Sequence, residues 1–246
     1  MIEAGSLIRS LSGRPAARNF HTFVINEIGH GIATGKFPVG SILASDAVMM
    51  ETYGVSRTVL REALKTLEAK GMVEARPKVG TRVSPSSRWN FFDPQVLFWH
   101  YDAAPNKRFY DSLFDVRQDT ERRAVMLACV RRTAEQVRLM KYWVHQMDVA
   151  GEAMEAHALA SLEVHQVIAD SSGNPLLRSA IGVVELTLAL AAKRRSADAD
   201  LAYQAASCAA HQSLVTAVEG SDTAAAVEQM QFIIEAERAR AVAGFA

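Results

Sequence analysis

Glycine and proline divide this chain into parts that have different folding options. Both residues interrupt the segment 20–83 repeatedly, whereas they are scarce after residue 107. Because glycine and proline end helices and mark turns, the first segment can form only short elements, and the second can form long helices. Between them, residues 84–105 combine turn residues with a dense aromatic run. The sequence therefore predicts two folded domains and a linker that packs against one or both of them.

The first segment has the pattern of three short helices followed by a β-hairpin. Apolar residues at helical spacing predict helices over 19–31 and 45–53, and a third helix that begins at Ser56 and ends before Gly71. The pattern then changes to alternation around a turn, which predicts a hairpin over 73–83. Three helices and a hairpin describe a winged helix-turn-helix, a DNA-binding fold.

Helical periodicity continues from Lys107 to the end of the chain, with no credible strand. The predicted fold is therefore mainly α, a winged helix-turn-helix followed by an all-α bundle of about six helices: 107–130, 133–150, 153–171, 175–195, 200–219 and 222–243. The expected domain boundaries are 1–84 for the first domain, including an N-terminal extension at 1–18, 85–106 for the linker, and 107–246 for the bundle.

The composition, with 49% hydrophobic and 22% charged residues, is that of a globular protein. Cys129 and Cys208 are far apart, so they predict neither a disulfide framework nor a cysteine zinc site. Residues 1–18 lack the apolar core of a signal peptide, and the apolar runs are too short or too interrupted to span a bilayer. We therefore expect a soluble cytoplasmic protein without a membrane partner.

Charge differs between the two halves, although the whole chain is neutral. Residues 1–88 carry 12 lysines and arginines against 7 acidic residues, and residues 89–246 carry 15 against 20. A basic domain favours a polyanionic partner, which for a helix-turn-helix is double-stranded DNA.

The third helix carries the residues expected to contact that DNA. Its apolar residues face inward, so Arg57, Thr58, Arg61 and Lys65 point outward beside the cap residue Ser56. An arginine can bind guanine O6 and N7 in bidentate fashion, whereas Thr58 and Lys65 suit phosphates. The hairpin adds a second set of contacts to the DNA backbone or minor groove: Arg76, Lys78, Gly80 and Arg82. The alternative is that these side chains only solvate a surface helix.

These residues resemble the DNA-binding domain of the GntR superfamily of bacterial transcription regulators. The resemblance covers residues 20–84 and rests on four stretches: Pro38-Val39-Gly40 through Leu43, Gly54-Val55-Ser56-Arg57-Thr58, Arg61-Glu62-Ala63-Leu64 with Leu67 and Gly71, and Gly80-Thr81-Arg82-Val83. One departure stands in the second helix. The family usually has Pro-Ser/Ala-Glu-Arg there and uses the arginine on DNA, but this chain has Ala44-Ser45-Asp46-Ala47.

Residues 107–240 resemble the FCD-type effector domain of the FadR subfamily. The matching stretches are Asp115-Val116-Arg117 with Glu121, His165 ahead of Ser172-Gly173-Asn174-Pro175, and His211 ahead of Glu219-Gly220-Ser221-Asp222. The linker, through Arg88-Trp89-Asn90, Asp93, Val96-Leu97 and Trp99, resembles that of sugar-acid regulators. The resemblance implies an effector pocket that includes Arg117, Ser161, His165, His211 and Arg238, with Arg117 as a carboxylate clamp. A simpler alternative pairs Arg117 with Glu121 at i,i+4.

The same family often holds a divalent metal through one aspartate and three histidines. Here the corresponding positions are Ser161, His165, His211 and Ile233, so half the set is missing. His165 and His211 therefore remain candidate metal ligands in an incomplete set, and hydrogen bonding to a small ligand is the alternative.

The resemblance implies a repressor of a sugar-acid operon that is released by a small organic acid. Because one recognition helix covers only a few base pairs, we also expect a homodimer that binds a palindromic operator. Two alternatives remain: a regulator that senses an acyl thioester or a dicarboxylate, and a helical metal-dependent enzyme. Against the enzyme, the chain has no nucleophile elbow, phosphate-binding glycine loop or HExxH motif.

Overall fold

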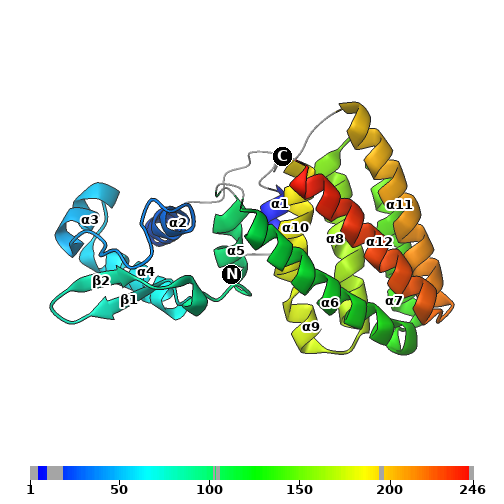
Figure 1. Cartoon of the computed structure of the whole chain (residues 1–246), viewed down its shortest axis with the longest axis horizontal. Coiled ribbons are helices and arrows are strands. Elements are labelled where there is room, and N and C mark those ends of the chain that lie inside the picture. The colour runs from blue at the N-terminus through cyan, green and yellow to red at the C-terminus, as the bar shows by residue number, and fades with distance from the viewer. Residues whose placement is uncertain (1–4, 10–18, 102, 104–105, 194–196, 244–246) are drawn as a thin grey trace. The chain divides into compact units, whose positions relative to one another are not determined.

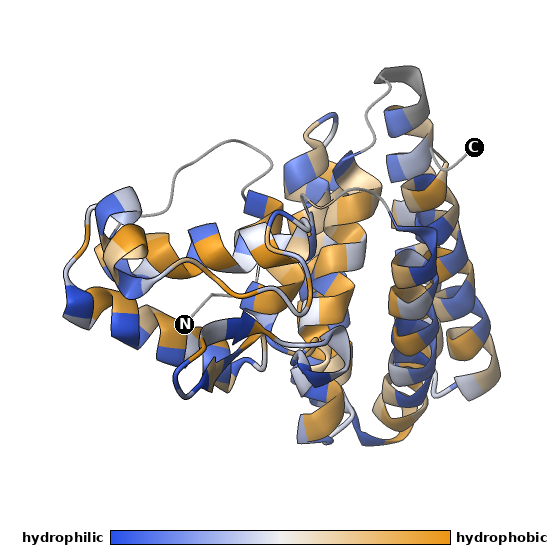
Figure 2. Ribbon diagram, turned by 60° about the vertical axis from the view of Figure 1, so that its left-hand side comes forward, coloured by the Kyte–Doolittle hydropathy of each residue, from blue (hydrophilic) through white to orange (hydrophobic). Residues whose placement is uncertain are grey.

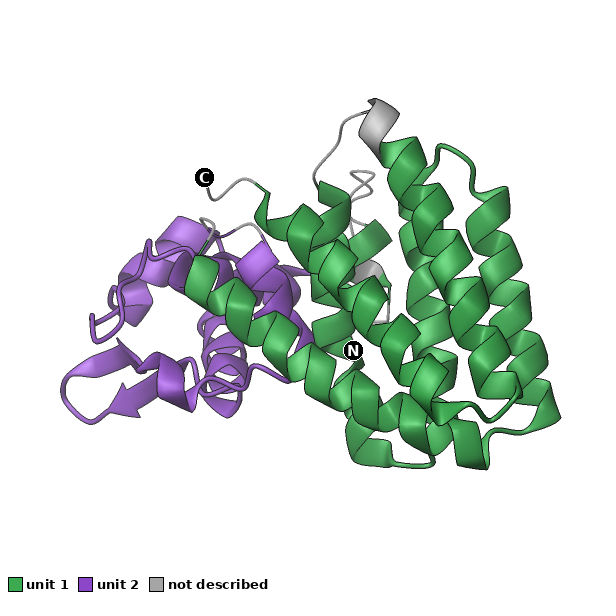
Figure 3. Cartoon of the chain, turned by 45° about the vertical axis from the view of Figure 1, so that its right-hand side comes forward, with its two compact units in different colours: residues 1–14, 105–246 green, residues 15–104 purple. Residues whose placement is uncertain are grey.

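The computed structural model describes residues 5–9, 19–101, 103, 106–193 and 197–243. It divides the chain into two compact units (Figure 3). The first unit comprises residues 15–104, and the second comprises residues 105–246 together with the N-terminal residues 1–14. The expected winged helix and all-helical bundle are both present, so the predicted fold class is confirmed.

The N-terminal unit is built on three helices whose first turns are capped by side chains. Asn19, Ser45 and Ser56 each accept a hydrogen bond from a backbone N–H three residues later. Gly54 takes the left-handed conformation, with φ +63°, that makes the turn between the second and third helices. The three helices, labelled in Figure 1, are α2 (Phe20–Ala33), α3 (Asp46–Tyr53) and α4 (Arg57–Ala69).

The wing is an antiparallel hairpin of β1 (Val73–Arg76) and β2 (Gly80–Val83), with Val73 opposite Val83. A third segment joins it, because the backbone N–H of Leu43 donates to the carbonyl of Thr81 at 2.8 Å. The stretch before α3 is thereby fixed to the wing.

The aromatic linker contains a helix that the sequence analysis did not expect, α5 (Pro94–Tyr101), after a short 3-10 turn (Ser86–Arg88). Trp99 is fully buried in the core of the N-terminal unit, and its Nε1 donates to Asn26 Oδ1 at 3.1 Å. Gly29 on α2 leaves the space for this ring, since a Cβ there would lie 2.5 Å from Trp99. The linker therefore packs on α2 as part of the N-terminal unit.

Replacing Gly71 by alanine should destabilise the N-terminal unit strongly. Gly71 has φ +76°, and a Cβ there would lie 2.0 Å from the carbonyl oxygen of Arg88. The substitution therefore adds a backbone clash to the left-handed conformational cost of about 1–2 kcal/mol. Gly35→Ala is the matched control, because φ is +81° but no atom lies within 4 Å. Urea unfolding followed by tryptophan fluorescence in a Trp143→Phe background measures both, and equal losses would contradict the clash.

The helical unit has one buried helix at its centre, α10 (Ile181–Lys193). Every residue of α10 from Gly182 to Ala192 is buried. Helices α6, α8 and α12 pack against it, and α6 and α12 also lie side by side in Figure 1. Hydrophobic residues, orange in Figure 2, recur along these helices. The other helices of the unit that follow the linker are α6 (Lys107–Arg131), α7 (Ala134–Val149), α8 (Met154–Ser171), α9 (Pro175–Ser179), α11 (Ala197–Glu219) and α12 (Thr223–Val242).

The prediction of a single helix over 175–195 is wrong, because this stretch forms two helices that meet at Ala180. None of the residues of α9 is buried, whereas α10 runs through the core. The break at Ala180 lets α9 lie at the surface while α10 stays buried. Among the described residues, the stretch Pro175–Lys193 is long and apolar enough to cross a membrane, but 67% of its window is buried inside the protein, as expected of a core helix.

The short helix α1 (Ser6–Arg9) belongs to the helical unit, although the sequence analysis placed the N-terminal extension with the DNA-binding domain. Leu7 and Ile8 are buried against α8 and α10. The backbone N–H of Leu7 donates to the buried carboxylate of Glu185 at 2.7 Å. Two apolar side chains and this hydrogen bond hold α1 there. Residues 1–4 and 10–18 of the extension lie outside the described residues.

Candidate DNA-binding surface and effector site

One face of α4 is buried and the opposite face is exposed and basic. Leu60, Ala63 and Leu67 are fully buried, so the helix is fixed in the core of its unit. The expected contact residues all lie on the exposed side: Ser56, Arg57, Thr58, Arg61 and Lys65. Ser56 Oγ also accepts a hydrogen bond from the backbone N–H of Val59 at 3.4 Å, so it caps the N-terminal end of the helix.

Two of these basic side chains have acidic neighbours. Arg61 lies 4.0 Å from Asp46 of α3, and Lys65 lies 2.8 Å from Glu62. Both pairs are exposed and therefore weak, so a phosphate or base can replace the acidic partner. Arg57 makes no ion pair with any described residue. At the position where the family has its additional arginine, Ala47 is exposed and offers only a methyl group.

The wing places its basic residues on the exposed side of the hairpin, as expected. Arg76 pairs with Glu74 at 2.7 Å, and Arg82 Nε donates to the carbonyl of Gly40 at 3.0 Å. Lys78 stands at the tip with φ +64° and is exposed. Gly80, which opens β2, lines a groove between the hairpin and α4 together with Arg61, Lys65, Arg76 and Lys78.

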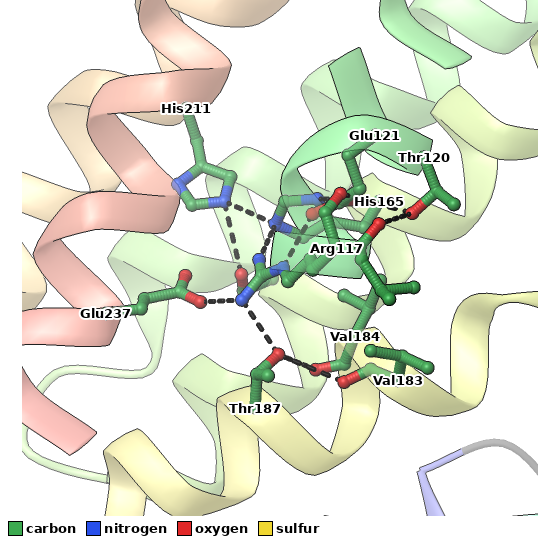
Figure 4. A network of polar contacts seen from close by, with 11 residues as sticks. Arg117, Thr120, Glu121, His165, Val183, Val184, Thr187, His211 and Glu237 are labelled. Carbon is green, nitrogen blue, oxygen red and sulfur yellow. Dashed lines mark hydrogen bonds and ion pairs between the residues drawn. The ribbon is translucent and has the colours of Figure 1, made fainter. Parts of the chain in front are cut away.

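The second site is a buried polar cluster centred on Arg117 of α6 (Figure 4). The guanidinium is fully buried, and its Nε donates to Glu121 Oε2 at 2.6 Å. Its Nη1 donates to Thr187 Oγ1 at 2.9 Å and forms an ion pair with Glu237 Oε2. Arg117 therefore joins helices α6, α10 and α12.

Two histidines extend the cluster towards α8 and α11. The Nδ1 of His165 lies 2.5 Å from Glu121 Oε1, and its Nε2 lies 3.3 Å from Arg117 Nη2. The Nε2 atoms of His165 and His211 are 3.4 Å apart, and Ser161 Oγ lies 3.1 Å from the latter. The structure thus brings together four of the five residues expected in the effector pocket.

The fifth expected residue, Arg238, does not join this cluster. Its guanidinium binds Asp111 at 2.8 Å and Asp115 at 3.3 Å on α6. The preceding residue, Glu237, points inward and takes a place in the cluster that the sequence analysis did not foresee. In the sequence, the only signal for Glu237 is that it follows Ile233, one of the four family metal positions, by one helical turn.

The cluster does not fit a divalent metal. The cationic guanidinium of Arg117 already lies against the nitrogen of His165 that would bind the ion. Ser161 and Ile233 replace two ligands, and no group of three suitable side chains exists in the described part of the chain. Buried polar groups bonded to one another are therefore the better description of His165 and His211.

Burial and neighbouring charges shift the pKa values of the cluster strongly. Burial alone would lower the pKa of Arg117, but Glu237 and Glu121 outweigh it and keep the guanidinium charged. Burial would raise the pKa of Glu121, but His165 and Arg117 lower it to about 2. Burial, with His165 adding to it, lowers the pKa of His211 to about 3, so this imidazole is neutral at pH 7.

Acidification should therefore destabilise the helical unit. The unfolded chain protonates His211 below about pH 6.5, whereas the folded chain does so only near pH 3. Its contribution to stability is present above pH 6.5 and is lost as the pH falls towards 3, by at most about 1.4 kcal/mol per pH unit. Urea unfolding at several pH values in this window should show a flatter slope for His211→Asn than for the unsubstituted protein. If stability depends on pH with the same slope in both proteins, the conclusion that His211 is buried as a neutral imidazole is contradicted.

Comparisons with known proteins identify both domains. The model "Bacterial regulatory proteins, gntR family" matches residues 21–83, and the model "FCD domain" matches residues 112–236. A winged-helix domain and an FCD domain in one chain define a two-domain transcription regulator. The chain belongs to the GntR family of bacterial transcription regulators, and its relatives are regulators rather than enzymes.

Two curated relatives and one solved structure illustrate the similarity. The Uncharacterized HTH-type transcriptional regulator YieP of Escherichia coli K12 is 34% identical over 166 residues, covering 67% of this chain and 72% of that protein. The Galactonate operon transcriptional repressor of the same organism is 26% identical over 203 residues, covering 82% and 88%. The structure of Lar of Listeria monocytogenes shares the fold, with TM-score 0.66, 13% identity and coverage of 94% and 100%.

Proposed function

We propose that this regulator represses a sugar-acid catabolic operon and leaves its operator when a small carboxylate effector binds in the helical unit. The observation that carries the proposal is the fully buried guanidinium of Arg117, which binds the carboxylates of Glu121 and Glu237 and could bind an effector's carboxylate in place of one of them. The similarity to a galactonate operon repressor supports the choice of a sugar acid.

The effector must open the site to bind. The cavity beside the cluster holds about 40 Å³, whereas ligand pockets usually measure about 300–1,000 Å³. It lies between α11 and α12, so binding requires these helices to separate or their side chains to rearrange. An effector that favours the open state shifts the population away from the state that binds the operator.

Two copies of the chain bind one operator in this proposal. One recognition helix contacts only a few base pairs, and two-fold symmetric pairs gain affinity from adjacent half-sites. The protein is then a cytoplasmic homodimer on a palindromic sequence. Native mass spectrometry of the full chain with its promoter DNA should give a mass of two chains per duplex, and one chain per duplex would contradict the dimer.

A mobility shift with the region upstream of the protein's own gene tests the proposal. The protein should shift this DNA without effector, and gluconate or galactonate should release it. Adipate and an acyl thioester belong in the same panel, because they represent a regulator for dicarboxylates or fatty acyl groups. Indifference to every acid would contradict the carboxylate effector, and release by the acyl thioester alone would contradict the sugar acid.

The exposed tip of the wing should contact phosphates and not bases. Lys78→Ala should weaken binding to specific and random duplexes alike, and should reduce the slope of log K against log salt by about one. Fluorescence anisotropy at several salt concentrations measures both quantities. Lys36→Ala, which changes a lysine outside the contact surface, is the control. A loss confined to the specific duplex would contradict a phosphate contact.

A further inference from the structure

Glu185 stands out in the buried helix α10, because it is the only charged residue from Ile181 to Ala192. It is 5% exposed, and the residues beside it along the helix are buried and mostly apolar. A buried carboxylate is costly unless it accepts hydrogen bonds. Glu185 therefore needs donors on an element that packs against α10.

The donors come from α1, near the start of the chain. Oε1 of Glu185 accepts a hydrogen bond from the backbone N–H of Leu7 at 2.7 Å. Burial raises the pKa of Glu185, and the backbone N–H groups of Leu7, Gly5 and Ile8 oppose this rise. The carboxylate of Glu185 thus serves as the acceptor for the first turn of α1.

Packing contacts hold the same segment on the helical unit. Leu7 is buried and Ile8 is fully buried, and α1 packs against both α8 and α10. Gly5 has φ +84°, and a Cβ there would lie 2.9 Å from Cδ2 of Leu159 on α8. Two apolar side chains, a hydrogen-bonded carboxylate and a close backbone approach together define a docking surface for residues 5–9.

The docked segment gives the DNA-binding unit a second attachment to the helical unit. The chain enters the DNA-binding unit after α1 and leaves it after α5, so elements of the helical unit both precede and follow it. Nine residues separate Arg9 from Asn19, and a chain of this length spans at most about 35 Å. Two short connections leave a domain fewer orientations than one connection does.

We propose that α1 is a second tether, which limits the orientations of the DNA-binding unit and thereby strengthens operator binding. Two DNA-binding units must reach half-sites at a fixed spacing, and orientations excluded before binding need not be lost during it. Without the docked segment, each unit is attached only through residues 102–106. The inference uses the two-chain operator complex of the proposed function, but not its effector.

A protease cut between α1 and α2 tests the tether without changing a residue of the docking surface. A protease recognition sequence inserted between Arg14 and Pro15, where the two units divide, allows the uncut and cut forms of one protein to be compared. The uncut form should bind the operator like the unsubstituted protein. In anisotropy titrations, cutting should weaken binding to the operator at least about fivefold. Binding to a scrambled duplex, which sets no half-site spacing, should change by less than about twofold.

Ile8→Asp in the same protein tests whether the tether acts through the docking of α1. The substitution places a charge at a fully buried position and should release α1, so the uncut form should bind the operator as weakly as the cut form. Cutting should then add less than about twofold, because the tether is already lost. Leu176→Asp is the matched control, since Leu176 is 79% exposed in the same unit, and it should keep the full effect of cutting.

Equal operator affinity of the cut and uncut forms would overturn the inference. Tighter binding by the cut form would also overturn it, because α1 would then be an inhibitory contact, as would an undiminished effect of cutting in Ile8→Asp. If Ile8→Asp unfolds the helical unit, the comparison of cut and uncut forms still decides. In each case, tight binding of the uncut form to the operator leaves the proposed function standing. If the uncut form does not prefer the operator to the scrambled duplex, both proposals fail together.

Discussion

Replacing Arg117 by methionine lowers the free energy of unfolding of the helical unit by about 3–5 kcal/mol, because the substitution leaves Glu121 and Glu237 buried without their cation. The ion pair between Arg117 and Glu237 links α6 to α12, and the hydrogen bond from Arg117 to Thr187 links α6 to α10. Buried ion pairs are weak evidence for net stability, but removal of one partner is costly, since the remaining charges lose both water and counter-charge.

Urea unfolding of the full chain, followed by circular dichroism, measures this loss. Arg122→Met is the control, because Arg122 is exposed on the same helix and should change the stability by less than about 0.5 kcal/mol. Adding Glu237→Gln to Arg117→Met should recover part of the loss, because it removes one unpaired charge. Equal effects of the Arg117 and Arg122 substitutions would mean that the cluster is hydrated in solution.

Replacing Arg57 or Arg61 by alanine weakens operator binding by about 1–3 kcal/mol for each arginine that binds a guanine in bidentate fashion. Both side chains are exposed on α4, and the helix is fixed by its buried face, so neither substitution should affect the fold. Loss of a base contact lowers the affinity for the operator but leaves binding to random DNA nearly unchanged. The ratio of the two affinities should therefore fall.

Anisotropy titrations with an operator duplex and a scrambled duplex separate these effects. Lys36→Ala, a substitution of an exposed cation outside α4 and the wing, is the control and should leave the ratio unchanged. Because Arg61 also lies near Asp46, Asp46→Ala should not reproduce the loss. Equal weakening on both duplexes would make Arg57 and Arg61 phosphate contacts and would contradict their reading of bases.

Local signals made the DNA-binding domain predictable from the sequence. The cap at Ser56, the glycine turn at Gly54 and the apolar spacing of α4 act within a few residues, and the structure has all three. A local signal for α5 was also present, since Asp93 and Pro94 form a cap and a first helical position. The aromatic run predicts burial there but has no helical periodicity of its own.

The effector site was predictable only in part, because its partners are distant along the chain. Arg117 and Glu121 lie one helical turn apart, so their pairing was visible as an alternative. Glu237 is 120 residues from Arg117, and helical periodicity does not distinguish it from Arg238 beside it. Only the packing of α12 against α6 decides which of these two charges points inward.

The central claim is that the exposed basic end of α4 recognises a specific DNA sequence. The most direct test is an anisotropy titration of the full-length protein against duplexes tiling the region upstream of its gene, beside scrambled duplexes of the same composition. At physiological salt, one duplex should bind at least about 10³-fold more tightly than its scrambled counterpart. Equal affinity for every duplex would contradict the account.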